Sequence, residues 1–198
     1  MFILTEIKDL VTIQPRHSSL PLDVSISNEL NKKYANKVLH NIGLCIRVHD
    51  ILSAGEAFIY HSDGLSYIKV QFRMIVFRPI IGEVFCGKVK TCSSSGIKVT
   101  LHFFDEINVI PELLREDAVY SAENQAWEWD MDGVKLDLMA EDIIKVRVIA
   151  ETFSESHPVP AKPKTQDQEI IHEAPKVPPY TLTCSIAEDG LGSVSWWE

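Results

Sequence analysis

The sequence lacks the marks of a membrane, secreted or disulfide-bonded protein. Its 198 residues contain no apolar run near the roughly 18 residues that a membrane-spanning helix needs. The stretch from Met1 to Glu6 carries no basic side chain, so we expect no secretory signal. The four cysteines form no Cys-x-x-Cys pair and are too few for a disulfide framework. We therefore expect reduced thiols in a protein of the cytosol or nucleus.

Motifs for catalysis and cofactor binding are also missing. The chain has no Gly-x-Gly-x-x-Gly, no phosphate-binding loop and no Gly-x-Ser-x-Gly. The seven histidines are scattered, and none pairs with another at metal-ligand spacing. Cys86 and Cys92 are six residues apart, and buried structural thiols are a simpler interpretation than zinc ligands. We expect a noncatalytic protein that holds no metal and no cofactor.

Basic residues are scarce in the second half of the chain. The net charge is −9 overall, about +2 over residues 1–80 and about −11 over residues 81–198. Tight nonspecific binding to nucleic acid requires clustered lysine and arginine, so the acidic half argues against it. The asymmetry also indicates two units with different surfaces.

The first 80 residues predict a small α+β unit. Apolar residues every fourth position from Ile26 to Val38 predict a helix there, with Asp23, Ser25 and Ser27 as candidate N-caps. Polar and apolar residues alternate over 42–49 and 68–76, which is typical of half-buried strands. Further short strands are expected at 2–4, 11–13 and 57–60. Strands flanking one amphipathic helix form an α+β unit.

The second half predicts a small barrel. Short alternating segments are expected as strands at 85–89, 97–103, 127–129, 144–148 and 180–186. Five such strands favour an OB barrel, and Asp132-Gly133 is a hairpin signal. Residues 154–179 hold six of the ten prolines and few aliphatic residues, so we expect a flexible insertion.

Basic residues occupy matching positions on the predicted barrel strands. They are Lys88, Lys90, Lys98, Lys145 and Arg147. If all point outward they form one cationic face, on which OB barrels bind single-stranded nucleic acid with aromatic platforms. His102 and Phe104 are further candidate RNA contacts, and Trp127 and Trp129 are candidate platforms. The alternative is a solvated outer face with the tryptophans in the core, and the pattern leaves both open.

The segment from Phe77 to Val89 resembles a known domain junction. It reads Phe-Arg-Pro-Ile-Ile-Gly-Glu-Val-Phe-Cys-Gly-Lys-Val. In RNA polymerase stalk subunits of the archaeal type and their eukaryotic relatives, a Phe-x-Pro and a following Glu-Val-x-x-Gly-x-Val join an N-terminal tip domain to an OB domain. The matching junction residues are Phe77, Pro79, Glu83 and Gly87. The resemblance implies an α+β tip domain at 1–80 and an all-β OB barrel at 81–198.

Other segments resemble the RNA polymerase III member of that family. They are Met1-Phe2, Glu29 to Val38, Gly43 to Ile46, Phe103-Phe104-Asp105, Trp127-Glu128-Trp129, Pro179 to Leu182 and Gly190 to Trp197. The resemblance implies a noncatalytic component of the nuclear polymerase that makes tRNA, 5S ribosomal RNA and other small RNAs. It implies a stalk heterodimer with a small helical partner, engagement of initiation factors and contact with nascent RNA.

The resemblance also implies that two loops of the tip domain, Gln14 to Pro21 and Gly55 to Leu65, dock on the polymerase core. The candidate docking residues are Gln14, Pro15, Arg16, His61, Asp63 and Gly64. The barrel departs from the related RNA-binding module, because Ser95 and Lys98 stand near its first hairpin where aromatics are usual. We therefore predict weak, salt-sensitive RNA binding centred on Lys88, Lys90 and Lys98.

Two other functions remain as alternatives. A free OB-fold factor in translation or RNA processing would need a basic barrel with intact aromatic platforms. An enzyme that uses the barrel to bind substrate would need a catalytic constellation in residues 1–80, where none is visible. The adjacent Trp196 and Trp197 would face opposite ways in a strand, so one of them is expected in the core.

Overall fold

The computed structural model describes residues 1–15, 20–61, 63–131, 134–154 and 177–196. By its internal contacts the chain divides into two compact units, Met1–Pro79 and Ile80–Glu198. The described residues are mostly β, with one α-helix. Arg16, the Asp132-Gly133 turn, Trp197 and residues 155–176 of the predicted insertion lie outside the described residues.

One twisted antiparallel sheet forms the first unit. Its strand order is β1-β5-β3-β2, with β4 paired to β5. The elements are β1 (Phe2–Ile13), α1 (Leu22–Tyr34), β2 (Lys37–Leu39), β3 (Gly43–Ala54), β4 (Phe58–Ile59) and β5 (Ser66–Phe77). Every residue of β1 pairs with β5 without a register shift, so the strands predicted at 2–4 and 11–13 are one strand.

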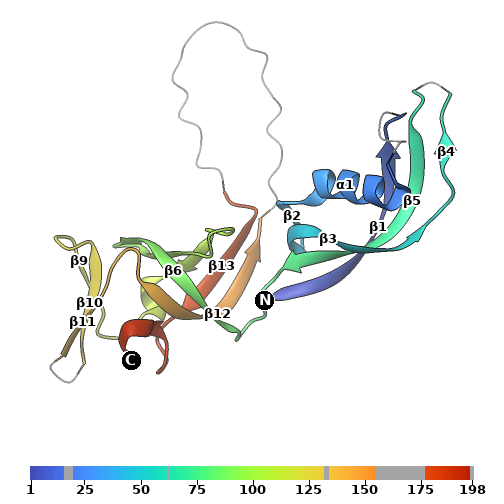
Figure 1. The fold of residues 1–198 in the computed structure, drawn as a ribbon. Helices are drawn as coiled ribbons and strands as arrows, with labels where there is room; N and C mark the ends of the chain where they lie inside the picture. Colours follow the sequence, from blue (N-terminus) through green and yellow to red (C-terminus); the bar gives the residue numbers. More distant parts are fainter. Residues whose placement is uncertain (16–19, 62, 132–133, 155–176, 197–198) are drawn as a thin grey trace, which may run out of the picture. The chain divides into compact units, whose positions relative to one another are not determined.

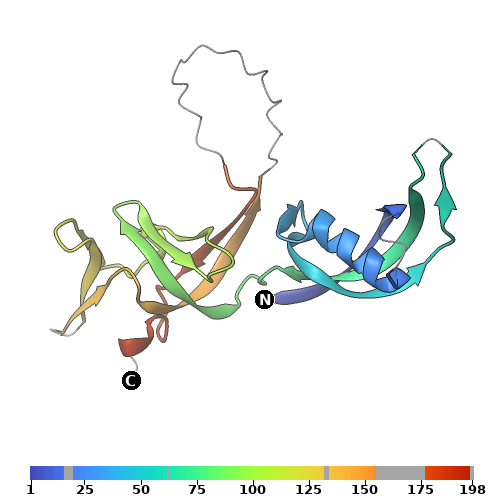
Figure 2. The same cartoon turned by 45° about the horizontal axis from the view of Figure 1, so that its top comes forward.

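The helix α1 covers one face of this sheet (Figure 2). Ile26 and Leu30 are fully buried against it, together with Phe72 and Met74 of β5. At the last turn of α1, Lys33 Nζ lies 2.5 Å from the Asp9 carboxylate of β1, and the Tyr34 hydroxyl donates to the same group at 2.8 Å. These bonds attach the end of the helix to the edge strand.

The helix lies four residues earlier than its apolar spacing predicts. It begins after Pro21, with no side-chain cap, and the predicted caps at 23, 25 and 27 lie inside it. It ends at Tyr34 because Asn36 takes a φ of +58°, which helical residues do not adopt. Val38 instead belongs to β2 and pairs with Leu44.

The second unit contains a five-stranded closed barrel (Figure 1). Its strands are β6 (Val84–Ser93), β7 (Gly96–Thr100), β8 (Ile107–Val109), β12 (Ile143–Phe153) and β13 (Tyr180–Ser185). The pairings run β6-β7-β8-β13-β12 and return to β6, with β8 and β13 parallel. Val89, Val99, Val146 and Leu182 are fully buried in the interior. The barrel is OB-like, and the predicted fold class is confirmed.

A second, three-stranded sheet stands beside the barrel. It consists of β9 (Val119–Ser121), β10 (Ala126–Met131) and β11 (Val134–Leu138). The strand predicted at 127–129 is therefore β10 of this sheet, and β8 supplies the third barrel strand. The predicted strand 97–103 ends at Thr100, because His102 has a φ of +68° and the chain turns there.

The chain end packs onto the second unit through Trp196. It lies in the 3₁₀ helix Val194–Trp196 after β14 (Gly192–Ser193), and not in a strand as predicted. Its ring meets Trp129 edge to face, with centroids 4.7 Å apart. The preceding 3₁₀ helix of this unit is Pro111–Leu113. Trp196 thus contributes to packing within the chain.

Candidate nucleic-acid interface

Five basic side chains share the outer face of the barrel. We call Lys88, Lys90, Lys98, Lys145 and Arg147 the cation row. Their neighbours along β6, β7 and β12, such as Val89, Val99 and Val146, are buried, and strand alternation therefore turns the basic residues outward. In the ladders, Lys145 stands opposite Cys86, and Lys88 stands opposite both Ile143 and Thr100. The structure thus brings the predicted basic residues onto one face.

Most of the cation row is neutralised by acids of the same chain. Lys88 pairs with Glu141, and Lys90 Nζ lies 2.6 Å from Asp105 Oδ2. Lys98 lies 3.3 Å from a Glu106 oxygen. Arg147 lies 3.0 Å from Glu188, and Lys145 has no ion-pair partner among the described residues. A phosphate that approaches the row therefore meets carboxylates beside most of the cations.

The acids are supplied by loops that border the row. Asp105 and Glu106 lie between β7 and β8, and the Lys90 ammonium group, followed by the Thr100 hydroxyl, lowers the pKa of Asp105. Glu141 lies in the turn before β12. Two backbone bonds hold this turn on Val89 of β6: Glu141 N–H donates to Val89 O at 2.9 Å, and Val89 N–H donates to Asp142 O at 2.8 Å. The turn thereby places Glu141 beside Lys88.

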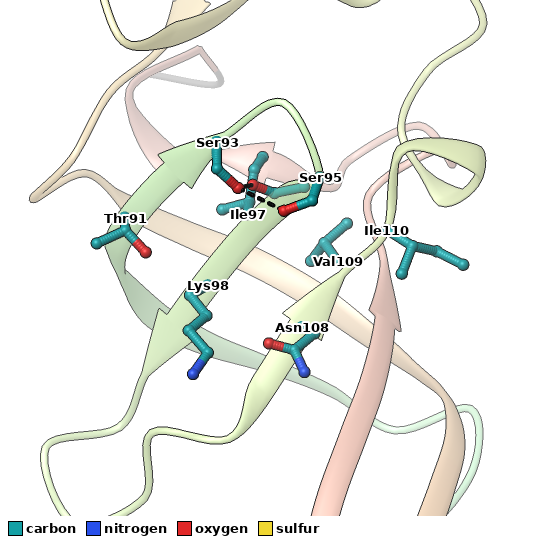
Figure 3. Close-up of a pocket in the computed structure, with 9 residues that line it drawn as sticks. Thr91, Ser93, Ser95, Ile97, Lys98, Asn108, Val109 and Ile110 are labelled. Carbon is teal, nitrogen blue, oxygen red and sulfur yellow. Dashed lines mark hydrogen bonds between the residues drawn. The ribbon is translucent and has the colours of Figure 1, made fainter. Parts of the chain in front are cut away.

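A polar hollow opens at the turn between β6 and β7. Figure 3 shows Lys98 and Asn108 on neighbouring strands and Ser93 bonded to Ser95 across the turn, 2.8 Å between their Oγ atoms. Its other lining residues are Thr91, Gly96, Ile97, Val109 and Ile110. Gly96 is required here, because its φ is +131° and a Cβ atom would lie 2.3 Å from Val109 O. Aromatic residues are absent from this lining as far as the structure describes it.

The predicted aromatic platforms are buried and cannot stack on bases. Phe104 is 7% exposed and packs against Tyr180, with ring centroids 5.5 Å apart. Trp127 and Trp129 are each 5% exposed, and the Trp127 indole donates to Ser93 O. The tryptophans are core residues, as the alternative interpretation has it, and Phe104 belongs to the packing around Tyr180.

The exposed aromatic side chain of this region is Phe103, which sequence reasoning missed. It is 44% exposed, in the same β7–β8 loop as Asp105 and Glu106. The exposed His102 lies in that loop as well, off the strand on which it was placed. The strand predicted at 97–103 placed Phe103 on its apolar side. The turn at His102 ends that strand, so Phe103 is exposed and Phe104 is buried.

The end of the first unit that carries β4 presents exposed apolar side chains. Phe58, Ile59 and Tyr60 are all exposed there, and we call them the apolar tip. Phe58 stacks on Tyr67 with centroids 6.1 Å apart, and Tyr60 meets Tyr67 edge to face at 5.0 Å. These side chains lie within the predicted docking loop 55–65, although the residues singled out there were His61, Asp63 and Gly64.

The predicted docking residues Asp63 and Gly64 build the turn behind the apolar tip. The Asp63 carboxylate accepts bonds from the Tyr67 hydroxyl at 2.6 Å and from Leu65 N–H at 3.0 Å, and these bonds lower its pKa. Gly64 has a φ of +65°, and its N–H donates to Tyr60 O at 3.2 Å. His61 is exposed beside them. Gln14 and Pro15 follow the end of β1.

Each residue of the predicted junction has a structural role in its own unit. Phe77 is fully buried and meets Phe2 edge to face at 5.6 Å, while Pro79 ends the first unit. The Glu83 side chain accepts a bond from Ile80 N–H at 2.9 Å, closing a turn at the start of the second unit. A Cβ atom on Gly87 would lie 2.5 Å from Val99 Cγ1, so only glycine fits.

Metal and membrane sites are not evident in the described residues. No group of three or more histidine, cysteine, aspartate or glutamate side chains within them could hold a metal ion. No helix there is both long and apolar enough to cross a membrane.

Comparison with known proteins identifies the family. Residues 83–197 match the model for RNA polymerase III subunit Rpc25, and residues 8–64 match the SHS2 domain found in the N terminus of Rpb7p and Rpc25p. The chain is 38% identical to DNA-directed RNA polymerase III subunit rpc8 of Schizosaccharomyces pombe over the full length of both chains. It is 40% identical to the RPC8 subunit of Bos taurus, covering 100% of this chain and 98% of that protein.

A more distant relative extends the comparison to archaea. The chain is 29% identical to DNA-directed RNA polymerase subunit Rpo7 of Saccharolobus solfataricus, over 61% of this chain and 67% of that protein. The resemblance to polymerase stalk subunits of the archaeal type is thus confirmed. With a family model that covers more than half of its length and full-length relatives at 38% and 40% identity, the chain belongs to the family of RNA polymerase III subunit Rpc25.

Proposed function

We propose that this chain is a noncatalytic subunit of DNA-directed RNA polymerase III in the nucleus. The observation that carries the proposal is its full-length similarity to polymerase III subunit RPC8 proteins of yeasts and cattle. The chain forms a stalk heterodimer with a small helical partner and supports initiation on genes for tRNA, 5S ribosomal RNA and other small RNAs. Within it, residues 1–80 act as the docking domain and residues 81–198 as the OB domain.

The apolar tip is the element that docks on the polymerase core. Phe58, Ile59 and Tyr60 expose apolar surface on a turn that Asp63 and Tyr67 hold in place. Clustered exposed apolar groups are costly in water and are typical of protein interfaces. Leu20 and Leu22 before and at the start of α1 are exposed as well. Docking therefore uses these apolar groups, with His61 and Gln14 at its border.

The small helical partner contacts exposed aliphatic residues of the second unit. Ile80, Ile81, Val84 and Ile149 are all exposed. Arg147 pairs with Val84 in the β6–β12 ladder, and Gly82 N–H donates to Val148 O, so Ile149 lies next to Val84 and the 80–82 turn. A patch of four aliphatic side chains suits the apolar face of an amphipathic helix.

The cation row and Phe103 contact nascent RNA. The row supplies phosphate contacts, and the exposed ring supplies a stacking surface. Because four of its five cations are paired with acids, the affinity is weak. It falls as salt rises, because the contacts to phosphate are electrostatic.

Affinity purification of the tagged endogenous protein, followed by mass spectrometry, tests the proposal. We expect stoichiometric recovery of the two largest polymerase III subunits, one small helical partner and, in smaller amounts, initiation factors. Recovery of ribosomes or mRNA-binding proteins, or of nothing stoichiometric, would contradict it. For the RNA contact, Lys88→Glu, Lys90→Glu and Lys98→Glu together should abolish binding of the purified heterodimer to single-stranded RNA.

A further inference from the structure

The geometry of the cation row points to an intramolecular competitor for RNA. We infer that Asp105, Glu106 and Glu141 occupy the phosphate-binding positions of Lys90, Lys98 and Lys88 in the free protein, and that single-stranded RNA binds by displacing them. The inference rests on the proposed RNA contact and adds the identity of the groups that limit it. We call these three acids the competitor acids.

Each competitor acid lies in a loop, whereas the lysine with which it pairs lies on a barrel strand. Lys88 and Glu141 are separated by 53 residues, and Lys90 and Asp105 by 15. Such pairs form only where loops fold back over the barrel face. Ion pairs at the surface are worth only about 0–1 kcal/mol each, so a chain of phosphates can displace the carboxylates at low cost. The competitor acids therefore weaken RNA binding without preventing it.

The backbone at Glu141 supports a role beyond ordinary turn formation. Its φ is +81°, a conformation in which glycine or asparagine is strongly favoured and glutamate is strained. The turn itself is closed by other groups: Asp142 Oδ2 accepts from Met139 N–H at 2.8 Å, and two backbone bonds join it to Val89. The Glu141 side chain contributes only the pair with Lys88 to this arrangement among the contacts described. The strained backbone thus places a carboxylate beside a predicted RNA contact.

Asp105 is held in position by hydrogen bonds within the β7–β8 loop and to its neighbours. Its carboxylate accepts from Lys90 Nζ and from the Thr100 hydroxyl, and Thr100 Oγ1 in turn accepts from His102 N–H at 3.0 Å. Leu101 N–H donates to Phe104 O at 3.0 Å and closes the loop. The loop geometry consequently presents the acid to Lys90, and the acid occupies the position of a phosphate in the free protein.

Neutralising the competitor acids tests the inference. The variant Asp105→Asn, Glu106→Gln, Glu141→Gln removes the three charges and keeps side-chain shape and one acceptor oxygen at each position. Its affinity for a labelled mixed-sequence single-stranded RNA is measured by fluorescence anisotropy, on the full chain in complex with its partner, at about 50 and about 200 mM salt. We expect binding about 10-fold tighter than that of the unmodified complex at the lower salt concentration.

A matched variant controls for net charge. Glu112→Gln, Glu116→Gln, Asp117→Asn changes the charge equally, at exposed positions between β8 and β9. An equal gain in the matched variant would overturn the inference, since net charge would then explain the effect. Unchanged affinity in the acid variant, with binding still lost on reversal of the three lysines, would overturn the inference and leave the RNA contact standing. RNA binding that survives the lysine reversal would overturn both.

Discussion

The Lys90 ammonium group lies 2.6 Å from the Asp105 carboxylate, and this pair ties strand β6 to the β7–β8 loop. The same loop carries Phe103, exposed, and Phe104, buried. The acid that pairs with Lys90 and an exposed aromatic ring thus lie on one short segment. The two phenylalanines are adjacent in sequence and opposite in environment, which makes them a matched pair for mutation.

Phe103→Ala should weaken RNA binding, whereas Phe104→Ala should destabilise the barrel. Loss of an exposed stacking ring costs about 1–3 kcal/mol of binding, roughly 5- to 150-fold in affinity. Loss of a buried phenylalanine costs about 3–5 kcal/mol of folding free energy. Fluorescence anisotropy with single-stranded RNA measures the loss of affinity, and urea unfolding measures the loss of stability. An RNA affinity that Phe103→Ala leaves intact would remove this ring from the interface.

Cys86 should report directly on occupancy of the cation row. It is exposed on β6 opposite Lys145, whereas Cys45 and Cys184 are buried. Burial raises the pKa of Cys45 to about 11 and that of Cys184 to about 12, so both stay protonated in mildly alkaline buffer. Iodoacetamide should then modify Cys86 first, and saturating RNA should slow the reaction several-fold. Mass spectrometry of the peptides measures the rate of Cys86 modification. Equal rates with and without RNA would show that RNA does not bind over the cation row.

Disrupting the apolar tip should release the chain from the polymerase without unfolding it. Phe58→Ser with Ile59→Ser removes exposed apolar surface, so the thermal midpoint should change little. Recovery of the largest polymerase III subunits in pull-downs should fall at least about fivefold. Leu4→Ser, at an exposed position of β1 in the same unit, is the control. Equal recovery with both variants would exclude the tip as the anchor.

The contact of Asp9 with Lys33 and Tyr34 should make stability depend on pH. Partial burial raises the pKa of Asp9, but bonds from Lys33 and Tyr34 outweigh it and lower the pKa below the ordinary 3.8. The contribution is therefore complete above pH 3.8 and is lost as the pH falls through the lower folded pKa. Asp9→Asn should cost about 1 kcal/mol at neutral pH and nothing once the pH is well below the folded pKa. Chemical unfolding at several pH values in this range measures the free energy of unfolding of the Asp9→Asn variant, with Glu56→Gln as the control. A stability loss in Asp9→Asn that does not change with pH would contradict the prediction.

Gly87→Ala should destabilise the second unit. The added methyl group would lie 2.5 Å from Val99 Cγ1 and 3.4 Å from Thr100 O, inside a packed barrel. Overpacking of this kind costs about 1–3 kcal/mol. Gly55→Ala, where the backbone is not left-handed and a Cβ atom would lie 3.4 Å from Lys69 O, separates the steric effect from loss of glycine itself. Equal losses of unfolding free energy in the two variants would argue against the close contact with Val99.

Alternation of side chains determined much of the fold from sequence. The outward direction of Lys88, Lys98 and Arg147 follows from the period of two in any strand, whatever the strand pairs with. The existence of one helix against a sheet followed from apolar spacing in the same way, although its ends did not. The ends depend on Pro21 and on Asn36, whose backbone is left-handed. Each is the effect of a single residue, and the apolar spacing does not reveal it.

Only the tertiary structure decided the electrostatics of the candidate site. The pairing of Lys88 with Glu141 joins residues 53 apart, and it depends on a turn whose backbone conformation glutamate rarely adopts. The exposure of Phe103 rather than Phe104 likewise depends on the turn at His102. Periodicity in a sequence specifies which side of a strand a residue takes. Which distant loop folds over that side depends on the closure of the whole barrel, and no local pattern encodes it.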